Sequence, residues 1–364
     1  MQNSTQSIKE KAYELGFDLI GIAPAGRAPH AEAYRRWLEH GYAGQMQWLA
    51  RAPHRREDPR QVVPGARSVI VVGLSYFVLD PPADLWADPA RGRIARYAWG
   101  LDYHEVMLPR LRELGHFIEK QVGHSLNQRA YVDTGPVLER DFAAQAGLGF
   151  IGKNTLLISP KLGSYLFLGE ILVDIELEYD EPSPDGGASC HTGPPGESKR
   201  LGTCGNCTRC LEICPTHALP APYILDSNRC ISYLTIELKG SIPVELRPLL
   251  GNWIYGCDEC QSICPWVRRY AQPTRENFLN YDPDSVAPKL VELMALDELT
   301  FRQRFKGTPL SRIKRRGLLR NVAVALGNWG DPAALPVLAQ AQQDPEPLIR
   351  EHVTWAIAQI KSKS

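Results

Sequence analysis

The arrangement of the cysteines constrains this chain more than any other feature of its sequence. Seven cysteines form two runs, and Cys230 stands alone between them. The runs are Cys204, Cys207, Cys210 and Cys214, followed directly by Pro215, and Cys257, Cys260 and Cys264, followed directly by Pro265. The first run has the spacing with which bacterial proteins bind 4Fe–4S clusters, and its fourth cysteine serves the other cluster. Eight cysteines in this order therefore predict two 4Fe–4S clusters.

If the last cysteine of each run crosses over in this way, the two ligand sets follow. One cluster takes Cys204, Cys207, Cys210 and Cys264, and the other takes Cys214, Cys230, Cys257 and Cys260. Cys230 departs from the pattern because no second cysteine follows it at the same spacing. Spacing alone leaves two alternatives open, zinc knuckles and a disulfide framework. The proline that follows each run fits an iron–sulfur turn better than a zinc ribbon.

Two adjacent clusters pass electrons one at a time, so the rest of the chain has to provide a redox centre and a substrate site. At 364 residues the chain exceeds what one core usually fills, and two or three domains are expected. The first residues contain neither an apolar run nor twin arginines, and no segment approaches the length of a membrane span. Nine cysteines without an export signal indicate metal ligation in a reducing compartment. We therefore expect a cytoplasmic protein that does not bind membranes.

The charge of the chain is balanced overall but unevenly distributed. A net charge of zero argues against a uniformly basic nucleic-acid-binding protein. Between residues 301 and 320, however, there are eight basic residues and no acidic one. They are Arg302, Arg304, Lys306, Arg312, Lys314, Arg315, Arg316 and Arg320. Such a run is usually the solvated face of a helix, and contact with a polyanion is the alternative that the missing carboxylates support.

Apolar periodicity predicts alternating helices and strands in the first half of the chain. Helices are expected over 4–16, 32–40, 104–122 and 136–147, and strands over 17–23, 68–78, 129–132 and 166–177. The strand at 68–78 is the clearest because β-branched residues dominate it. This alternation predicts a layered α/β or α+β domain, which we assign to residues 1–180.

Changes of composition suggest the other boundaries. Residues 181–203 are rich in Pro, Gly and Ser and are expected to form a linker that contains Cys190, for which a free thiol fits better than a metal role with His191. Residues 204–300 would form the iron–sulfur domain. Residues 301–364 would be a basic segment and helices joined at the Asp-Pro turns of Asp331 and Asp344, which are typical of HEAT repeats. A unit this short has to pack on the iron–sulfur part.

One segment of the first domain has the composition of a catalytic loop. Asp133 follows the expected strand and precedes a helix, and glycines at 147, 149 and 152 would let the backbone approach a ligand closely. Asp133 or Thr134 could simply cap the helix. The functional alternative is that Asp133 projects into a pocket and donates a proton.

Together, several segments resemble the epoxyqueuosine reductase family over nearly the whole chain. These are 133–136, 152–154, 163–172, the cysteine runs and the terminal repeat. The resemblance implies a multidomain α+β protein with an N-terminal α/β cobalamin-binding domain related to that of reductive dehalogenases, a ferredoxin-like domain with two 4Fe–4S clusters and a C-terminal α-helical HEAT-like repeat. It also implies an oxidoreductase of queuosine biosynthesis, a tRNA modification, which uses cobalamin to reduce epoxyqueuosine to queuosine at the wobble position of tRNA.

The resemblance also implies roles for individual residues. Asp133 matches the proton donor of the family. Residues that would line the corrinoid pocket are Arg60, Tyr97, His104, Asp133, Lys153, Leu157, Leu168 and Ile231, with Ala95 near the cobalt face, where some members have cysteine. Residues that would meet tRNA are Lys239, Lys314, Arg315 and Arg316.

The sequence bears separately on how the cobalamin is held. Proteins that place a histidine on cobalt use Asp-x-His-x-x-Gly, whereas here Asp102, Tyr103 and His104 are followed by Glu105, Val106 and Met107. The glycine is missing, so we expect a base-off cobalamin without a histidine ligand. We further expect a monomer that receives electrons from an external low-potential donor, with Asp133 protonating the departing oxygen of the epoxide.

Two other functions stay open at this point. A corrinoid-dependent reductase of a small molecule, such as a reductive dehalogenase, would share the corrinoid and both clusters, but those enzymes usually have a twin-arginine signal and lack a basic repeat. An electron-transfer or cobalamin-reactivating protein would explain the clusters and leave the basic run and the Asp133 segment without a role.

Overall fold

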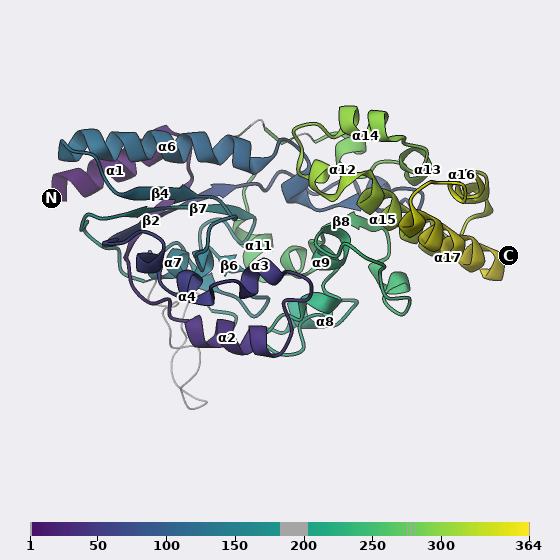
Figure 1. Cartoon of the computed structure of the whole chain (residues 1–364), viewed down its shortest axis with the longest axis horizontal. Helices are drawn as coiled ribbons and strands as arrows, with labels where there is room; N and C mark the ends of the chain where they lie inside the picture. Colours follow the sequence, from purple (N-terminus) through teal and green to yellow (C-terminus); the bar gives the residue numbers. More distant parts are fainter. Residues whose placement is uncertain (1, 183–202, 275, 277, 280, 364) are drawn as a thin grey trace.

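The computed structural model describes residues 2–182, 203–274, 276, 278–279 and 281–363 (Figure 1). An elongated molecule results, with the N-terminal layers at one end and the C-terminal helices at the other. The cysteine-bearing segments lie between these two ends. The expected linker and Cys190 lie almost entirely outside the described residues. Within the described residues, no helix is long and apolar enough to cross a membrane.

The N-terminal part is built on one four-stranded sheet. Its strands are β1 (Leu19–Pro24), β2 (Ser68–Ser75), β7 (Leu166–Val173) and β4 (Gln128–Tyr131), in the order β1-β2-β7-β4. Every neighbouring pair is antiparallel, although helices and strands alternate along the chain as expected. Strand β2 is buried at all eight positions because it is central and covered on both faces. This burial explains its continuous run of β-branched residues.

Helices cover both faces of this sheet (Figure 1). On one face, α1 (Gln2–Glu14) and α6 (Tyr103–Val122) pack on Ile70, Val72 and Ile171. On the other face, α7 (Glu139–Gln145) and the short strands β5 (Phe150–Ile151) and β6 (Leu157–Ile158) pack on Val69, Val71 and Leu172. The predicted helices and strands of this region are all present, with ends that differ from the expected ranges by a few residues. The largest differences are at α7, which starts three residues later than expected, and β7, which ends at Val173.

Short elements connect this layer to the cysteine region. They are α2 (Ala31–Glu39), α3 (Gln47–Ala50), α4 (Pro53–Glu57), η1 (Pro59–Gln61), α5 (Ala83–Ala87), β3 (Arg93–Ile94) and η2 (Arg96–Ala98). In the cysteine region the elements are α8 (Arg209–Glu212), η3 (Ser227–Arg229), α9 (Ile231–Ile236), η4 (Arg247–Leu250), β8 (Trp253–Tyr255), α10 (Glu259–Ser262) and α11 (Pro265–Tyr270). Strand β3 pairs in parallel with β8. A segment of the first half is therefore built into the cysteine region.

The C-terminal part is wholly helical within the described residues. It contains α12 (Pro283–Val286), α13 (Leu290–Met294), α14 (Glu298–Arg304), η5 (Pro309–Ile313), α15 (Lys314–Trp329), η6 (Pro332–Ala334), α16 (Leu335–Ala341) and α17 (Pro347–Lys363). Helices α15 and α17 approach closely at Gly327, where an added Cβ would lie 2.6 Å from the Trp355 ring. One core joins residues of α15 to Ile94, Trp99 and Tyr255. The expected packing of the repeat on the cysteine region is confirmed.

Two buried polar side chains secure this junction. Arg320 of α15 is 1% exposed and donates to the carbonyl oxygens of Leu234 at 2.7 Å, Leu238 at 2.6 Å and Gly240 at 2.8 Å. His352 of α17 is fully buried, and its Nε2 accepts from the Ile242 N–H at 3.2 Å. These bonds satisfy backbone groups of α9 and of the loop that follows it, which would otherwise be buried without partners.

Candidate redox and proton-donor site

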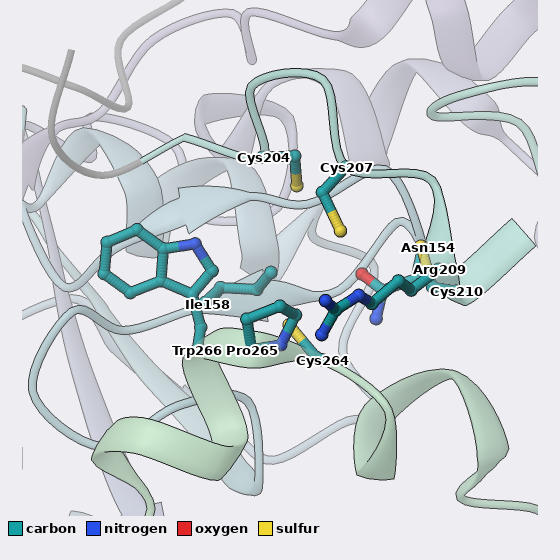
Figure 2. A pocket seen from close by; sticks show the side chains of 9 residues that line it. All are labelled: Asn154, Ile158, Cys204, Cys207, Arg209, Cys210, Cys264, Pro265 and Trp266. Carbon is teal, nitrogen blue, oxygen red and sulfur yellow. The ribbon is translucent and has the colours of Figure 1, made fainter. Parts of the chain in front are cut away.

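Four cysteines from distant parts of the sequence line one cavity (Figure 2). They are Cys204, Cys207, Cys210 and Cys264, and the cavity has a volume of about 150 Å³. Asn154, Ile158, Arg209, Pro265 and Trp266 complete its lining, with Ile158 beside Trp266 and Asn154 beside Cys210. The set is the one expected from the crossover, because Cys264 joins the first run from about 55 residues further along the chain.

The remaining described cysteines form a second, more deeply buried group. Cys230 and Cys257 pack against the same apolar cluster, and the thiols of Cys230, Cys210 and Cys214 are near enough to Cys260 to help raise its pKa. Burial raises the pKa of the Cys230 thiol, and it raises the pKa values of Cys257 and Cys260 further. None of the eight described cysteines forms a disulfide, so a disulfide framework of these residues is not formed.

The chemistry of both groups fits iron–sulfur clusters. Burial raises the pKa of Cys210 to about 11, so the thiolates that a cluster needs would form only with a bound cation. Backbone N–H groups also point at the sulfurs, as at Lys153 N to Cys204 Sγ, 3.4 Å, and Ala218 N to Cys214 Sγ, 3.3 Å. Such N–H to sulfur bonds tune cluster potentials.

Ala95 lies directly against the second cysteine group. Its N–H donates to the Tyr255 carbonyl at 2.8 Å, and a Cβ added at Gly256 would lie 2.6 Å from the Ala95 Cβ. Gly256 precedes the predicted ligand Cys257 and has a φ of +67°, so both space and backbone favour glycine there. Ile231, which follows Cys230, belongs to the same apolar cluster as Ala95. The structure therefore brings these two predicted pocket residues together.

Asp133 lies in a turn between β4 and α7. Its φ is +60°, an uncommon value for a residue other than glycine, and its side chain is 60% exposed. Helix α7 begins later, with Leu138 as its N-cap and no side-chain capping bond. The alternative in which Asp133 or Thr134 caps the helix is therefore wrong, because the chain makes an extra turn before the helix starts.

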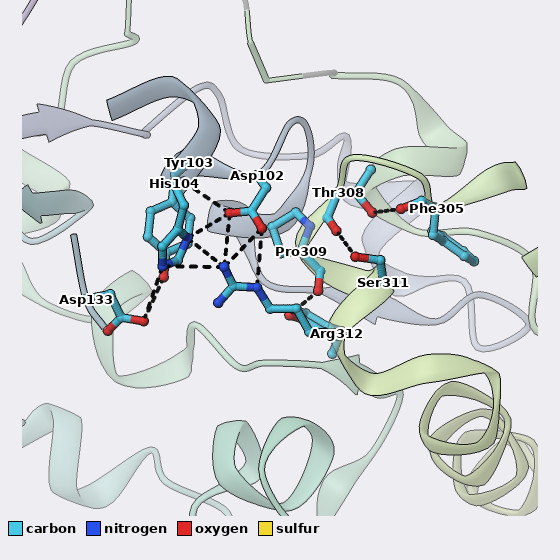
Figure 3. Close-up of polar contacts among 10 residues, drawn as sticks. Asp102, Tyr103, His104, Asp133, Phe305, Thr308, Pro309, Ser311 and Arg312 are labelled. Carbon is cyan, nitrogen blue, oxygen red and sulfur yellow. Dashed lines mark hydrogen bonds and ion pairs between the residues drawn. The ribbon is translucent and has the colours of Figure 1, made fainter. Parts of the chain in front are cut away.

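The Asp133 carboxylate belongs to a polar network (Figure 3). The Tyr103 hydroxyl donates to Asp133 Oδ2 at 3.0 Å, and His104 Nε2 lies 3.9 Å from the same oxygen. Both residues start helix α6, which places them on one side of Asp133. Burial, followed by the charge of Asp133, raises the pKa of Tyr103. The phenol therefore stays neutral and acts as a donor.

Arg312 completes the network from the basic run. Its Nη2 donates to Asp102 Oδ2 at 3.0 Å, and its guanidinium lies over the Tyr103 ring at 5.9 Å. His104 Nδ1 lies 2.7 Å from Asp102 Oδ1. Arg312 Nη2 lies 2.7 Å from His104 Nδ1 as well. Because a guanidinium can only donate, Arg312 donates to Asp102, while His104 Nδ1 donates to Asp102 in one tautomer and accepts from Arg312 in the other. Burial alone would raise the pKa of Asp102, but these bonds hold it at about 2.

The other predicted pocket residues are spread over two regions. Tyr97 lies between the second cysteine group and the Asp133 network, with its ring 5.9 Å from Tyr255 and 6.3 Å from Tyr103. Leu157 and Leu168 pack together on the α7 face of the sheet. Arg60 is exposed and paired with Asp58. Lys153 contacts the first cysteine run, where its Nζ donates to the carbonyls of Gly205 at 2.7 Å and Cys207 at 3.0 Å.

The basic run is divided by the fold. Lys239, Lys314 and Arg316 are exposed, and Arg316 donates to the Lys239 carbonyl at 3.0 Å, so these three expected RNA contacts share one surface. Arg315 turns inward instead, donating to the Leu296 carbonyl and pairing with Asp344. Arg320 is buried and Arg312 joins the Asp133 network. The predicted basic run therefore loses Arg315 and Arg320 from the surface, because both side chains turn inward, whereas Arg302, Arg304 and Lys306 are exposed.

Sequence analysis missed the part that Arg312 plays. Asp102 and His104 were recognised only as an incomplete cobalt-binding motif, and Arg312 was one member of a charge run. The partners are 210 residues apart in the chain. No local sequence pattern predicts a contact between residues this far apart in the chain. The missing acidic residues of the run were the available signal, since any ion pair that Arg312 forms has to come from another part of the chain.

Comparison with known proteins agrees with this organisation. Three family models match the chain: epoxyqueuosine reductase QueG (DUF1730) over residues 56–134, a 4Fe–4S double cluster binding domain over 203–267, and HEAT repeats over 316–364. The chain is similar to the epoxyqueuosine reductase of Escherichia coli, with 42% identity over 97% of this chain and 89% of that protein. It is also similar to the epoxyqueuosine reductase of Pseudomonas aeruginosa, with 44% identity over 97% of this chain and 93% of that protein.

The chain is also similar to solved structures of epoxyqueuosine reductases. A crystal structure of an epoxyqueuosine reductase with an epoxyqueuosine-modified tRNA-Tyr stem loop matches with a TM-score of 0.86 and 31% identity, covering 98% of this chain and 89% of that chain. An epoxyqueuosine reductase from Bacillus subtilis, whose catalytic aspartate loop is swung out of the active site, matches with a TM-score of 0.82 and 31% identity, covering 98% and 90%.

Proposed function

The chain belongs to the epoxyqueuosine reductase family, and from this premise we propose that it uses cobalamin to reduce epoxyqueuosine to queuosine at the wobble position of tRNA. It is an oxidoreductase of that family. The observation that carries the proposal for this chain is a cavity lined by four cysteines, a second cysteine group, and an exposed acid whose network reaches that second group through Tyr97. Reduction of an epoxide to an alkene requires both electrons and protons.

The overall reaction fixes what the site has to deliver. Converting an epoxide to an alkene takes two electrons and two protons and releases one water. We assign the electrons to clusters held by Cys204, Cys207, Cys210 and Cys264 and by Cys214, Cys230, Cys257 and Cys260. An external low-potential donor would supply them. We assign delivery of a proton to the departing oxygen to Asp133.

The network around Asp133 suits this role. Tyr103 donates to one carboxylate oxygen, which leaves the other oxygen free to carry the proton that is delivered. Asp102 stays ionised and holds both His104 and Arg312 in place. Arg312 in turn restricts the Tyr103 ring. The donor is therefore oriented by side chains from α6 and from the C-terminal part, so docking of that part helps to complete the site.

When bound, cobalamin would supply a low-potential cobalt centre that the clusters can reduce. The residues that fit its binding are Ala95 and Ile231 beside the second cysteine group, Tyr97 between that group and Asp133, Leu157 and Leu168 on the α7 side, and Arg60 at the surface. We propose base-off binding without a histidine ligand. His104 supports this, because Asp102 fixes its Nδ1 and its Nε2 faces Asp133. For Lys153 we propose a different task, which is to hold the loop of the first cysteine group.

The proposed tRNA contacts are predicted basic residues whose side chains are exposed. Lys239, Lys314 and Arg316 would bind backbone phosphates, and the modified base would reach the Asp133 network. Arg315 would act indirectly, by fixing this surface to Asp344. We keep the domain assignment of 1–180, 204–300 and 301–364, joined by the linker 181–203, and the expectation of a cytoplasmic monomer as parts of the proposal.

The deciding experiment is mass analysis of nucleosides from tRNA that carries epoxyqueuosine. The tRNA is incubated with anaerobically reconstituted protein and a reductant, with and without cobalamin. We expect queuosine only with cobalamin. The Asp133→Asn variant should keep its iron and cobalamin and lose conversion, whereas Asp84→Asn, an exposed control, should not. No conversion by fully loaded wild-type protein would favour a corrinoid reductase of a small molecule, and full activity of Asp133→Asn would remove Asp133 from its role.

A further inference from the structure

A carboxyl group is buried in the middle of the sheet without a donor. Glu170 lies on β7, opposite Val71 of β2 and Tyr131 of β4, on the face that α7 covers. Its side chain is fully buried, and neither of its oxygens has a hydrogen-bond donor among the residues that the structure describes. Its surroundings on this face are otherwise apolar. A lone carboxylate in such a place would be very unfavourable.

Glu139, the first residue of α7, faces Glu170. Helix α7 packs on β7, and Glu139 Oε1 is also buried without a donor in the described part of the chain. The Glu139 carboxyl group is close enough to Glu170 to raise the pKa of Glu170. Two ionised carboxylates have only acceptors, so a hydrogen bond between them needs a proton. Burial and the neighbouring charge of Asp133 raise the pKa of Glu139 to about 8, and burial with the charge of Glu139 raises the pKa of Glu170 well above its ordinary value. The pair therefore keeps a proton at neutral pH.

The charged and titratable groups around the pair do not replace this proton. Arg56 of α4 is the nearest cation in front of it, but its Nη1 donates to the Gly135 carbonyl at 2.9 Å and its Nε has no partner among the described residues. Arg140 of α7 points outward and donates to the Thr155 carbonyl. Tyr131 of β4, Tyr103 of α6 and Asp133 are the other titratable groups that face it. None of them is a cation.

The pair is connected to Asp133 through the backbone. The Asp133 N–H faces the Glu139 carboxyl group and lowers its pKa, and φ at Asp133 is +60°. The Asp133 side chain is held separately by Tyr103. The turn therefore has two attachments, one to α6 through the side chain and one to the acid pair through the backbone. If the pair lost its proton, two buried negative charges would stand beside the Asp133 carboxylate and repel it.

We propose that Glu139 and Glu170 are positioning residues that share one proton beneath the Asp133 turn, and that this proton keeps Asp133 in place at the site. The inference rests on the proposed function of Asp133. It predicts a loss of turnover at high pH that reflects ionisation of the buried pair, since an ionised pair would release the turn.

The main test uses the isosteric variant Glu170→Gln in the reconstituted holoenzyme. A glutamine amide donates to Glu139 at every pH, so we expect the high-pH decline of kcat to move upward by at least about one pH unit, with KM for the tRNA changed less than about twofold. Glu113→Gln, an exposed position on α6, is the matched control and should leave the profile as in the wild type. An unmoved decline in Glu170→Gln would overturn the proposal.

A second measurement does not depend on activity. The wild-type protein should show the infrared absorption of a buried protonated carboxyl at neutral pH, and this band should disappear between about pH 7 and about pH 9. Glu170→Gln and Glu139→Gln should each lack it, and Glu113→Gln should retain it. Absence of the band from the wild type would refute the shared proton. If the wild type does not convert epoxyqueuosine, the proposed function fails, whereas conversion together with an unmoved pH profile and no band would reject only the acid pair.

Discussion

Replacing Arg320 by methionine should loosen the junction between the C-terminal helices and the cysteine region. Methionine keeps much of the apolar volume of the arginine stem but removes all its donors. The carbonyls of Leu234, Leu238 and Gly240, all in or after α9, would lose their partner. The side chain of Asn321 would lose two further contacts at 2.9 and 3.0 Å. The change therefore acts on the loop that precedes the second cysteine run.

The size of the effect can be worked from these contacts. Three charge-assisted bonds of about 2 kcal/mol each, with about 1–2 kcal/mol for Asn321, amount to roughly 7–8 kcal/mol. Burial lowers the pKa of Arg320 to about 10, which corresponds to about 3 kcal/mol of unfavourable desolvation that the variant no longer has. The difference is a net destabilisation of about 4 kcal/mol.

The assay is native-state hydrogen exchange by mass spectrometry on the anaerobically reconstituted protein. Peptides covering α15 and the loop after α9 should lose protection by roughly two to three orders of magnitude, because each 1.4 kcal/mol is about a factor of ten. Arg302→Met is the matched control, since Arg302 is exposed and pairs only with Glu298 four residues earlier. Its effect should stay below about 0.5 kcal/mol. Equal losses of protection in the two variants would refute the reasoning.

Three further outcomes are expected. Cys230→Ala should leave about four of about eight irons per chain after reconstitution, and undiminished iron would show that Cys230 is not a ligand. Lys314→Ala should reduce the slope of log affinity for tRNA against log salt by about 1. Arg315→Ala should lower the free energy of unfolding without changing that slope. The opposite pattern would contradict the assignment of these two residues. Burial lowers the pKa of His352 from 6.5 to about 4, so the unfolded chain binds a proton that the folded chain excludes. The free energy of unfolding should then rise with pH across this range by up to about 1.4 kcal/mol per pH unit, and His352→Gln should flatten the rise measured by urea denaturation.

Local patterns predicted the parts of the structure that depend on neighbouring residues. The helices and strands of the first half follow apolar periodicity, and their existence was predictable although their ends were not. The start of α7 at Glu139 is an example, because the turn at Asp133 needs a positive φ that no propensity reveals in an aspartate. The solvent exposure of the basic residues between 301 and 320 was not predictable for the same reason. Their spacing shows charge, but only the packing of α15 decides which residues face solvent.

The sequence by itself predicted the two cysteine groups that we propose as cluster ligands. Cysteine spacing within each run fixes which sulfurs can reach one cluster, since a few residues of backbone have a limited reach. Only the tertiary structure decided the surroundings of Asp133. Arg312 reaches Asp102 across 210 residues of sequence, and Glu139 meets Glu170 only because α7 lies on that face of the sheet. Those contacts depend on how the helices and the sheet pack on one another. This packing is set by the whole chain, so no short stretch of residues predicts it.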